Sequence, residues 1–142
     1  MSDGSERSIE ITRLAKGRYV AENTRGGRLE FGAGTESERF SPVELFLTAV
    51  AGCTAIDVDY ITSKRAEPEH FSVTMTGDKI RDEDGCNRLV NLTVRLDLRF
   101  PDDEGGTAAR EVLPSAVQRS HDRLCTVSRT VEDGTPVDTG LA

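Results

Sequence analysis

The sequence predicts a protein that combines α-helices with antiparallel β-hairpins, and three stretches of the chain indicate it. Apolar and polar residues alternate from Leu92 to Phe100, which is typical of a strand with one buried and one solvated face. Short alternations between Ser8 and Phe31, separated by glycine-containing turns, indicate a small antiparallel sheet. Between these regions, the stretch from Leu45 to about Arg65 carries apolar residues on nearly every side of a helical repeat.

The N-terminal part of the chain is expected to form two or three strands between Ser8 and Phe31. Lys16-Gly17 and Gly26-Gly27 mark the tight turns that join them. Residues 1–7 read MSDGSER, without the basic-then-apolar pattern of a signal peptide, and are expected to be disordered. Gly32 to Phe40 is polar and contains glycine, so we expect a loop there.

A long helix is expected to follow that loop. Ser41 and Glu44 have the spacing of a capping box, and Pro42 suits the first helical position. A helix that is apolar on nearly every side is normally covered on all sides. We therefore expect the helix up to about Arg65 to be buried at the centre of the protein.

The second half of the chain is expected to begin with a hairpin. Apolar residues alternate with polar ones from Phe71 to Met75 and again from Leu92 to Phe100, which predicts two strands. Asp82 to Arg88 is polar and contains a glycine, and we expect it to be the hairpin loop.

The C-terminal part is expected to be mainly helical. Thr107 to Leu113 has helical spacing, and Pro114 either kinks that helix or opens a new one that ends near Leu124. Only a short terminal strand is expected from Gly134 to Ala142.

Composition narrows the classes of function. The chain has 142 residues with 18 Lys and Arg against 25 Asp and Glu, a net charge of −7 that argues against a nucleic-acid partner. This length suits a single domain, residues 1–142. Polar residues interrupt the most apolar stretch, Val43 to Val58, so no membrane association is expected. Three cysteines without an export signal favour reduced thiols in the cytoplasm over a disulfide framework.

Cys53 lies in the middle of the predicted central helix, and two neighbours set it apart from an ordinary core cysteine. Gly52 costs about 1 kcal/mol of helix propensity, which indicates that something packs against the backbone there. Asp57 follows four residues later, on the same face of the helix. A carboxylate on a buried helix needs a partner, so Asp57 is a candidate supporting residue. The alternative is that Cys53 only fills the core.

The other two cysteines have different surroundings. Cys125 follows the second helical pattern, where the neighbouring Arg123 and Arg129 favour a thiolate and an inert thiol at a helix end fits equally well. Cys86 lies in the hairpin loop and is expected to be exposed and incidental.

Two motifs together carry a family resemblance. Phe40 to Val58 reads FSPVELFLTAVAGCTAIDV and Leu124 to Ser128 reads LCTVS. They resemble the osmotically inducible protein C and organic hydroperoxide resistance (OsmC/Ohr) family, and the order of elements agrees over nearly the whole chain. The resemblance implies an α+β fold in an OsmC/Ohr-like intertwined homodimer. A long buried central helix would pack against antiparallel sheets, with the reactive thiols near the dimer interface.

The resemblance also implies an activity, the reduction of organic (alkyl or lipid) hydroperoxides in oxidative-stress defence. Cys53 would be the peroxidatic thiol, whose thiolate becomes a sulfenic acid. Cys125 would be the resolving thiol that condenses with it to a disulfide. An external dithiol or thiol reductant would reopen the disulfide, so neither a cofactor nor a metal is expected. Apolar side chains around Cys53 would favour alkyl or lipid hydroperoxides over hydrogen peroxide.

Peroxidase members of the family use an arginine near the thiolate and a glutamate that orients it. Arg39 and Arg18 are the candidate arginines for activating the thiol. The family's glutamate directly follows the proline, where this chain has Val43, and Glu44 comes one residue later. Glu44 is about 180° around a continuous helix from Cys53, so capping the helix is favoured over a supporting role at the thiol.

Two other classes of function stay open. The same fold suits a non-catalytic small-ligand-binding or redox-sensing protein in which Cys53 is structural. A metal site built from Cys53, His121 and Cys125, with Asp57, is the third hypothesis. It is disfavoured because the spacing is unlike the CxxC pairs of zinc modules and His121 fits an exposed helix turn.

Overall fold

The computed structural model describes residues 4–34 and 37–142 of the chain. In these ranges it combines helices with two antiparallel sheets, which confirms the α+β class. The chain divides into two compact units, Met1–Phe46 and Leu47–Ala142. Residues 1–3 and 35–36, parts of the predicted disordered terminus and of the predicted loop, lie outside the described residues. Residues 4–7 form neither helix nor strand.

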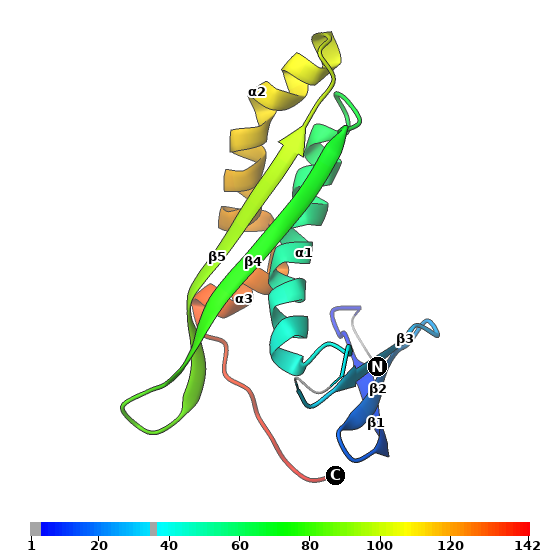
Figure 1. Cartoon of the computed structure of the whole chain (residues 1–142), viewed down its shortest axis with the longest axis vertical. Coiled ribbons are helices and arrows are strands. Elements are labelled where there is room, and N and C mark those ends of the chain that lie inside the picture. Colours follow the sequence, from blue (N-terminus) through cyan, green and yellow to red (C-terminus); the bar gives the residue numbers. More distant parts are fainter. Residues whose placement is uncertain (1–3, 35–36) are drawn as a thin grey trace. The chain divides into compact units, whose positions relative to one another are not determined.

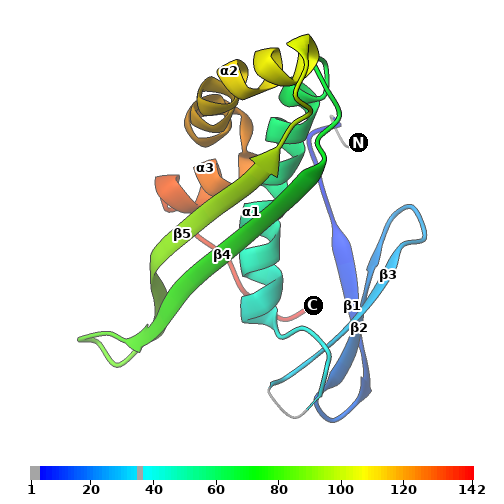
Figure 2. The same ribbon diagram turned by 45° about the horizontal axis from the view of Figure 1, so that its top comes forward.

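The N-terminal unit contains a three-stranded antiparallel sheet, as predicted (Figure 2). Its strands are consecutive in the chain: β1 (Ile9–Ala15), β2 (Arg18–Asn23) and β3 (Arg28–Gly32). Gly17 and Gly26 occupy the turns with φ of 77° and 90°, a backbone conformation that favours glycine. Val20 and Phe31 are buried, and the ring of Phe31 stacks on that of Tyr19, its neighbour on β2.

Helix α1 (Pro42–Thr62) begins at the proline, as predicted. The capping box forms in full. The backbone N–H of Glu44 donates to Ser41 Oγ at 3.2 Å, and the backbone N–H of Ser41 donates to Glu44 Oε1 at 2.9 Å. Two N–H groups that the helix itself leaves unpaired are thereby satisfied.

The expectation that α1 is buried on all sides is wrong for the single chain. One stripe is buried, made of Val50, Ala51, Thr54, Val58 and Thr62. On the opposite side Ile56 is 58% exposed and Tyr60 is 71% exposed. A Cβ added at Gly52 would meet no atom within 4 Å, so the close packing expected there is also absent among the described residues. Sequence periodicity measures how apolar a face is, and what covers it is decided by tertiary and quaternary contacts.

The length and apolar composition of α1 would also allow it to cross a membrane, contrary to the expectation from its polar interruptions. The core helix of a globular protein passes the same test. The buried stripe of α1 shows that this helix has core contacts within its own chain.

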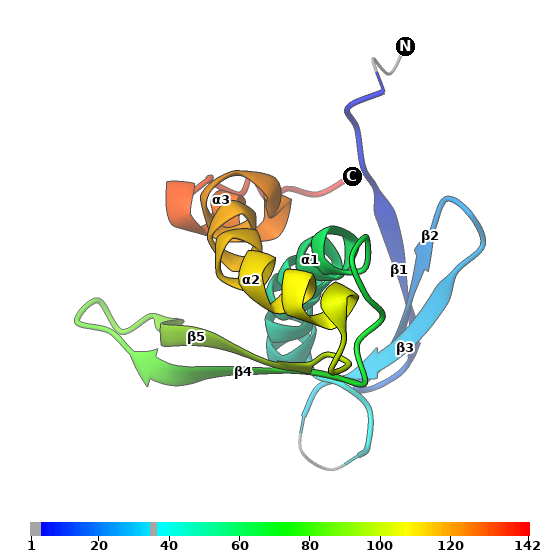
Figure 3. The same cartoon turned by 90° about the horizontal axis from the view of Figure 1, so that it is seen from above.

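The predicted hairpin is present in the second unit as β4 (His70–Arg81) and β5 (Asn87–Arg99). Its turn is shorter than expected, because Asn87 and Arg88 already belong to β5. Figure 1 and Figure 3 show α1 and the C-terminal helices on one face of this hairpin.

The C-terminal helices differ in part from the prediction. Helix α2 (Glu104–Arg119) runs through Pro114 without opening a new helix there. A π-helical turn, η1 (Ser120–Leu124), leads into α3 (Thr126–Asp133), which was not predicted. The predicted terminal strand is wrong: Gly134 ends α3 in a left-handed conformation, and the residues after it join neither sheet.

Candidate functional site

Two cysteines that are distant in the sequence meet in the second unit. Cys53 lies on α1 and Cys125 directly precedes α3. Their sulfur atoms and a carboxylate oxygen of Asp57 all lie within 4.8 Å of one another. Both thiols are free. Because a disulfide bond is about 2.05 Å long, the two sulfurs need to approach by less than about 3 Å to form one.

The local backbone explains how Cys125 reaches this position. Its N–H donates to the carbonyl of Ser120 at 2.9 Å, which closes the wide π-helical turn η1. Cys125 itself has extended backbone angles, φ −75° and ψ 100°, so the chain turns there and starts α3. Cys125 is therefore the N-cap residue of α3.

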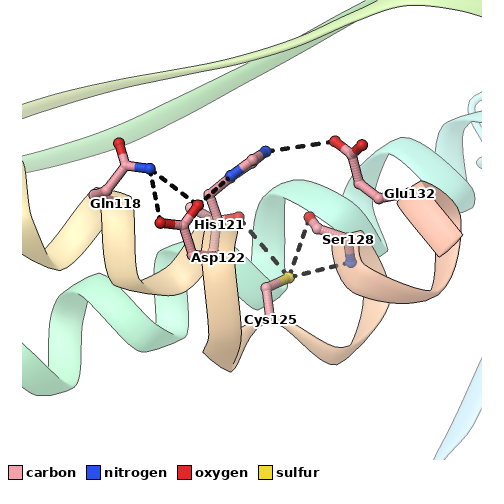
Figure 4. A network of polar contacts seen from close by, with 7 residues as sticks. Gln118, His121, Asp122, Cys125, Ser128 and Glu132 are labelled. Carbon is pink, nitrogen blue, oxygen red and sulfur yellow. Dashed lines mark hydrogen bonds and ion pairs between the residues drawn. The ribbon is translucent and has the colours of Figure 1, made fainter.

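Cys125 is fully buried, at 0% exposure, and its sulfur has three hydrogen-bond contacts. The Ser128 N–H donates to the sulfur at 3.4 Å, and the thiol donates to the Ser128 hydroxyl at 3.3 Å (Figure 4). The Thr54 hydroxyl donates to the sulfur at 4.0 Å. Burial raises the pKa of Cys125, but interactions with Cys53, Ser128 and Thr54 outweigh it, so the pKa lies below that of an ordinary thiol. The Cys53 thiol and the start of α3 therefore both favour a thiolate at Cys125.

The Cys53 thiol is partly exposed and behaves in the opposite way. Burial raises its pKa most, and the neighbouring Cys125 thiol and Asp57 carboxylate raise it further. A hydrogen bond with the backbone of Val127 offsets only part of this effect. The described contacts of Cys53 thus hold it as a neutral thiol, and its ionisation needs a positive charge from elsewhere.

Asp57 has the partner that the sequence required. The buried Ser120 hydroxyl donates to Asp57 Oδ2 at 2.8 Å. This contact joins α1 to the π-helical turn and fixes the direction in which the carboxylate points.

The remaining predicted residues belong to the N-terminal unit. Arg18 and Arg39 line one pocket there together with Lys16. Arg18 pairs with Glu30 at 3.3 Å, whereas none of the described carboxylates forms an ion pair with Arg39. Glu44 caps α1.

Other charged and thiol groups lie near the two motifs. Arg123 and Arg129 line a separate surface pocket. The leading interactions that lower the pKa of Cys125 are hydrogen bonds with Cys53, Ser128 and Thr54 rather than these arginines. Cys86 is exposed, as predicted.

His121 is exposed, as predicted, and does not contact the sulfurs. Its Nδ1 lies 2.9 Å from Asp122 Oδ1 and its Nε2 lies 3.4 Å from Glu132 Oε1 (Figure 4). The hydrogen bond to Asp122 raises the pKa of His121, with a smaller contribution from Glu132. The group of possible metal ligands in the described chain is Cys53, Asp57 and Cys125, without the histidine that the sequence suggested.

A cavity of about 440 Å³ next to Cys125 was missed by sequence reasoning. Thr54 and Ser128 form part of its wall and also contact the Cys125 sulfur. The alternation along β5 was the available signal, because its inward side chains supply much of the apolar wall. The apolar wall consists of Val50, Met75, Leu92, Val94, Leu96, Val117 and Val131.

Comparison with known proteins gives the following matches. A model of the OsmC-like protein family matches residues 34–140. Uncharacterized proteins of Mycobacterium tuberculosis and Mycobacterium bovis are each 29% identical over 130 residues, covering 90% of both chains.

Solved structures agree in fold. An OsmC-like protein of unknown function from Vibrio cholerae matches with a TM-score of 0.74 at 18% identity, covering 90% of this chain and 94% of its own. The organic hydroperoxide resistance protein OhrB of Bacillus subtilis matches with a TM-score of 0.54 at 17% identity, covering 87% and 90%.

Replacing Ser128 by alanine is expected to raise the pKa of Cys125. The substitution removes the hydroxyl that stabilises the thiolate and keeps the backbone N–H. Residue-resolved ¹³Cβ NMR titration of the reduced protein measures this pKa. Ser115→Ala, on the exposed side of α2, is the matched control. An unchanged Cys125 titration in the Ser128 variant would contradict the assignment.

Proposed function

Because the chain belongs to the OsmC-like protein family, we propose that it is a thiol-dependent peroxidase that reduces organic hydroperoxides in oxidative-stress defence. One observation carries this proposal: two free thiols lie within 4.8 Å, close enough for peroxide to convert them into a disulfide. The fold that the chain shares with organic hydroperoxide resistance proteins supports it.

The exposure of the two thiols supports the roles proposed for them. Cys53 is partly exposed and Cys125 is buried, so Cys53 meets the hydroperoxide. Its thiolate attacks the distal oxygen, the O–O bond breaks, and the alcohol leaves after taking up a proton. The Cys125 thiolate then attacks the resulting sulfenic acid, an S–S bond forms as the S–O bond breaks, and the hydroxide takes up a proton and leaves as water. An external dithiol or thiol reductant in the cytoplasm reopens the disulfide, so the cycle needs no cofactor.

The apolar cavity beside Cys125 suits the alkyl or lipid part of such a substrate. It equally supports the second candidate, a small-ligand-binding or redox-sensing protein on the same fold. The two candidates differ in one respect. A peroxidase oxidises and regenerates its thiols in repeated cycles, whereas a binding or sensing protein does not.

The attacking thiolate requires an arginine in this scheme. The described contacts of Cys53 raise its pKa, and a guanidinium beside the sulfur reverses that effect. Arg39 is the first candidate because no described carboxylate pairs with it, whereas Arg18 already pairs with Glu30.

A second copy of the chain is the partner that the exposed side of α1 requires. Gly52, Ile56 and Tyr60 follow one another at helical spacing on that side, and a small residue next to large exposed apolar ones suits close helix packing. We therefore propose a homodimer that covers this stripe.

Treatment of the reduced protein with one equivalent of cumene hydroperoxide is expected to form an intramolecular Cys53–Cys125 disulfide, because the sulfurs are already neighbours. Peptide mass spectrometry identifies the bond. Cys86→Ser is expected to keep full turnover with a dithiol, whereas Cys53→Ser is expected to lose it.

If Cys53 and Cys125 both remain free thiols after one equivalent of hydroperoxide, the peroxidase proposal is rejected. If an apolar ligand then binds equally well to the wild type and to Cys53→Ser, the ligand-binding function replaces it.

Arg39→Ala is expected to lower kcat/KM for cumene hydroperoxide by about 100-fold or more, as loss of a group that stabilises the reacting charge does. Arg18→Ala is expected to have a smaller effect. Initial rates with a dithiol reductant measure both. Equal activity of the Arg39 variant and the wild type would show that Arg39 does not activate Cys53.

Ile56→Glu is expected to convert the dimer to monomers, because it places a charge in the stripe that the second copy covers. Light scattering after size-exclusion chromatography measures the mass. Glu67→Gln, beyond the end of α1, is the control. A wild-type protein that is monomeric at micromolar concentration would contradict the dimer.

A further inference from the structure

The cluster around the two sulfurs is also suited to a metal ion. We propose that the reduced protein binds one thiophilic divalent cation of the zinc(II) type through Cys53 Sγ, Cys125 Sγ and the Asp57 carboxylate. Thiolate and carboxylate are ordinary zinc ligands, and three protein ligands leave the fourth tetrahedral position for water. Binding releases the two thiol protons to solvent and changes no oxidation state.

The geometry needs little adjustment for this ion. The three ligand atoms lie within 4.8 Å of one another. Zinc bonds of about 2.3 Å to sulfur and about 2.0–2.2 Å to oxygen place tetrahedral ligand atoms about 3.5–3.8 Å apart. The cluster therefore has to contract by about 1 Å, which is less than disulfide formation demands.

The charge of the cluster calls for a cation. All three groups are negative when deprotonated, and they lie in a partly buried region. Within residues 4–34 and 37–142, the groups that hydrogen-bond to them are hydroxyls, the other thiol and the backbone of Val127 and Ser128, and none is a basic side chain. A divalent ion compensates this charge locally.

The contact that supports Asp57 has the form of an outer-shell interaction. The buried Ser120 hydroxyl donates to Asp57 Oδ2 and leaves the other carboxylate oxygen for the metal. Outer-shell donors of this kind fix the orientation of metal ligands and contribute to affinity. His121 is not required, because its two nitrogens already face carboxylates.

Metal binding itself does not depend on the proposed peroxidase activity. Its proposed consequence, competition between zinc and hydroperoxide for the two sulfurs, does depend on it. Sulfurs bound to zinc are not free to attack a peroxide. When hydroperoxide does oxidise the complex, the two thiolates lose two electrons to form the disulfide. The hydroperoxide takes up those electrons and two protons to give alcohol and water, and the zinc ion leaves. Zinc and hydroperoxide therefore compete for the same sulfurs.

The test uses the full-length Cys86→Ser protein, so that the exposed thiol contributes nothing. After reduction and removal of metal by a chelator, calorimetric titration with zinc chloride is expected to give one ion per chain. Cobalt(II) is expected to give the sulfur-to-metal charge transfer and intense visible bands of a tetrahedral thiolate site. Cys53→Ser and Cys125→Ser are each expected to lose these bands.

Asp57→Asn tests whether the carboxylate is a zinc ligand or whether the two thiols bind zinc without it. It is expected to weaken zinc binding by about tenfold or more, and Ser120→Ala by a smaller factor. Asp59→Asn, an exposed carboxylate two residues along the same helix, is the matched control and is expected to bind as the parent does. Circular dichroism confirms that each variant is folded. If Asp57→Asn does not fold, X-ray absorption of the parent protein decides whether two sulfurs and an oxygen ligate zinc.

Substoichiometric binding, an octahedral cobalt spectrum without sulfur charge transfer, or equal zinc affinity in the Asp57 and Asp59 variants would each overturn the site. Zinc binding is measured without peroxide, and peroxide turnover is measured in metal-free protein. Failure of the metal site and failure of the peroxidase are therefore seen separately.

Discussion

One packing contact determines the chemistry of this protein: the buried stripe of α1 against the corner formed by η1 and the start of α3. Thr54 and Val58 lie in that stripe and fix the rotation of α1 about its axis. Cys53 and Asp57 each precede one of these residues, so the same rotation turns both toward the corner that holds Cys125. The Thr54 hydroxyl reaches the Cys125 sulfur, and the Ser120 hydroxyl holds Asp57 from the other side.

The two thiols differ because of where each lies on its helix. The N–H groups at the start of a helix are not used by the helix itself, so Cys125 receives one from Ser128. In the middle of α1 every backbone N–H is already bonded, and Cys53 obtains such a contact only from Val127 on the facing segment. These surroundings lower the pKa of Cys125 and raise that of Cys53. In the proposed mechanism, the Cys53 thiolate that attacks the hydroperoxide therefore depends on a cation.

Local patterns predicted most of the strands, the capping box at Ser41 and the shared face of Cys53 and Asp57, because alternation and helical spacing are properties of neighbouring residues. Local patterns failed where contacts between distant segments determine the structure. Helix α3 exposes most of its short length, so its pattern gives little signal, although it supplies the donors for Cys125. Ser120 was not identified as the partner of Asp57, because that contact joins distant segments. The all-round apolarity of α1 was correctly recognised, but one side of this helix is exposed in the single chain.

The cluster needs a positive charge whichever chemistry it performs. Two sulfurs and a carboxylate at this separation repel one another when ionised, and the described surroundings supply only neutral donors. An arginine compensates one charge and leaves the Cys53 sulfur open to attack a substrate. A divalent metal ion compensates two charges and occupies both sulfurs. Because the two proposed cations neutralise the same groups, they would exclude each other, and under both proposals the identity of the cation decides whether the thiols are reactive or protected.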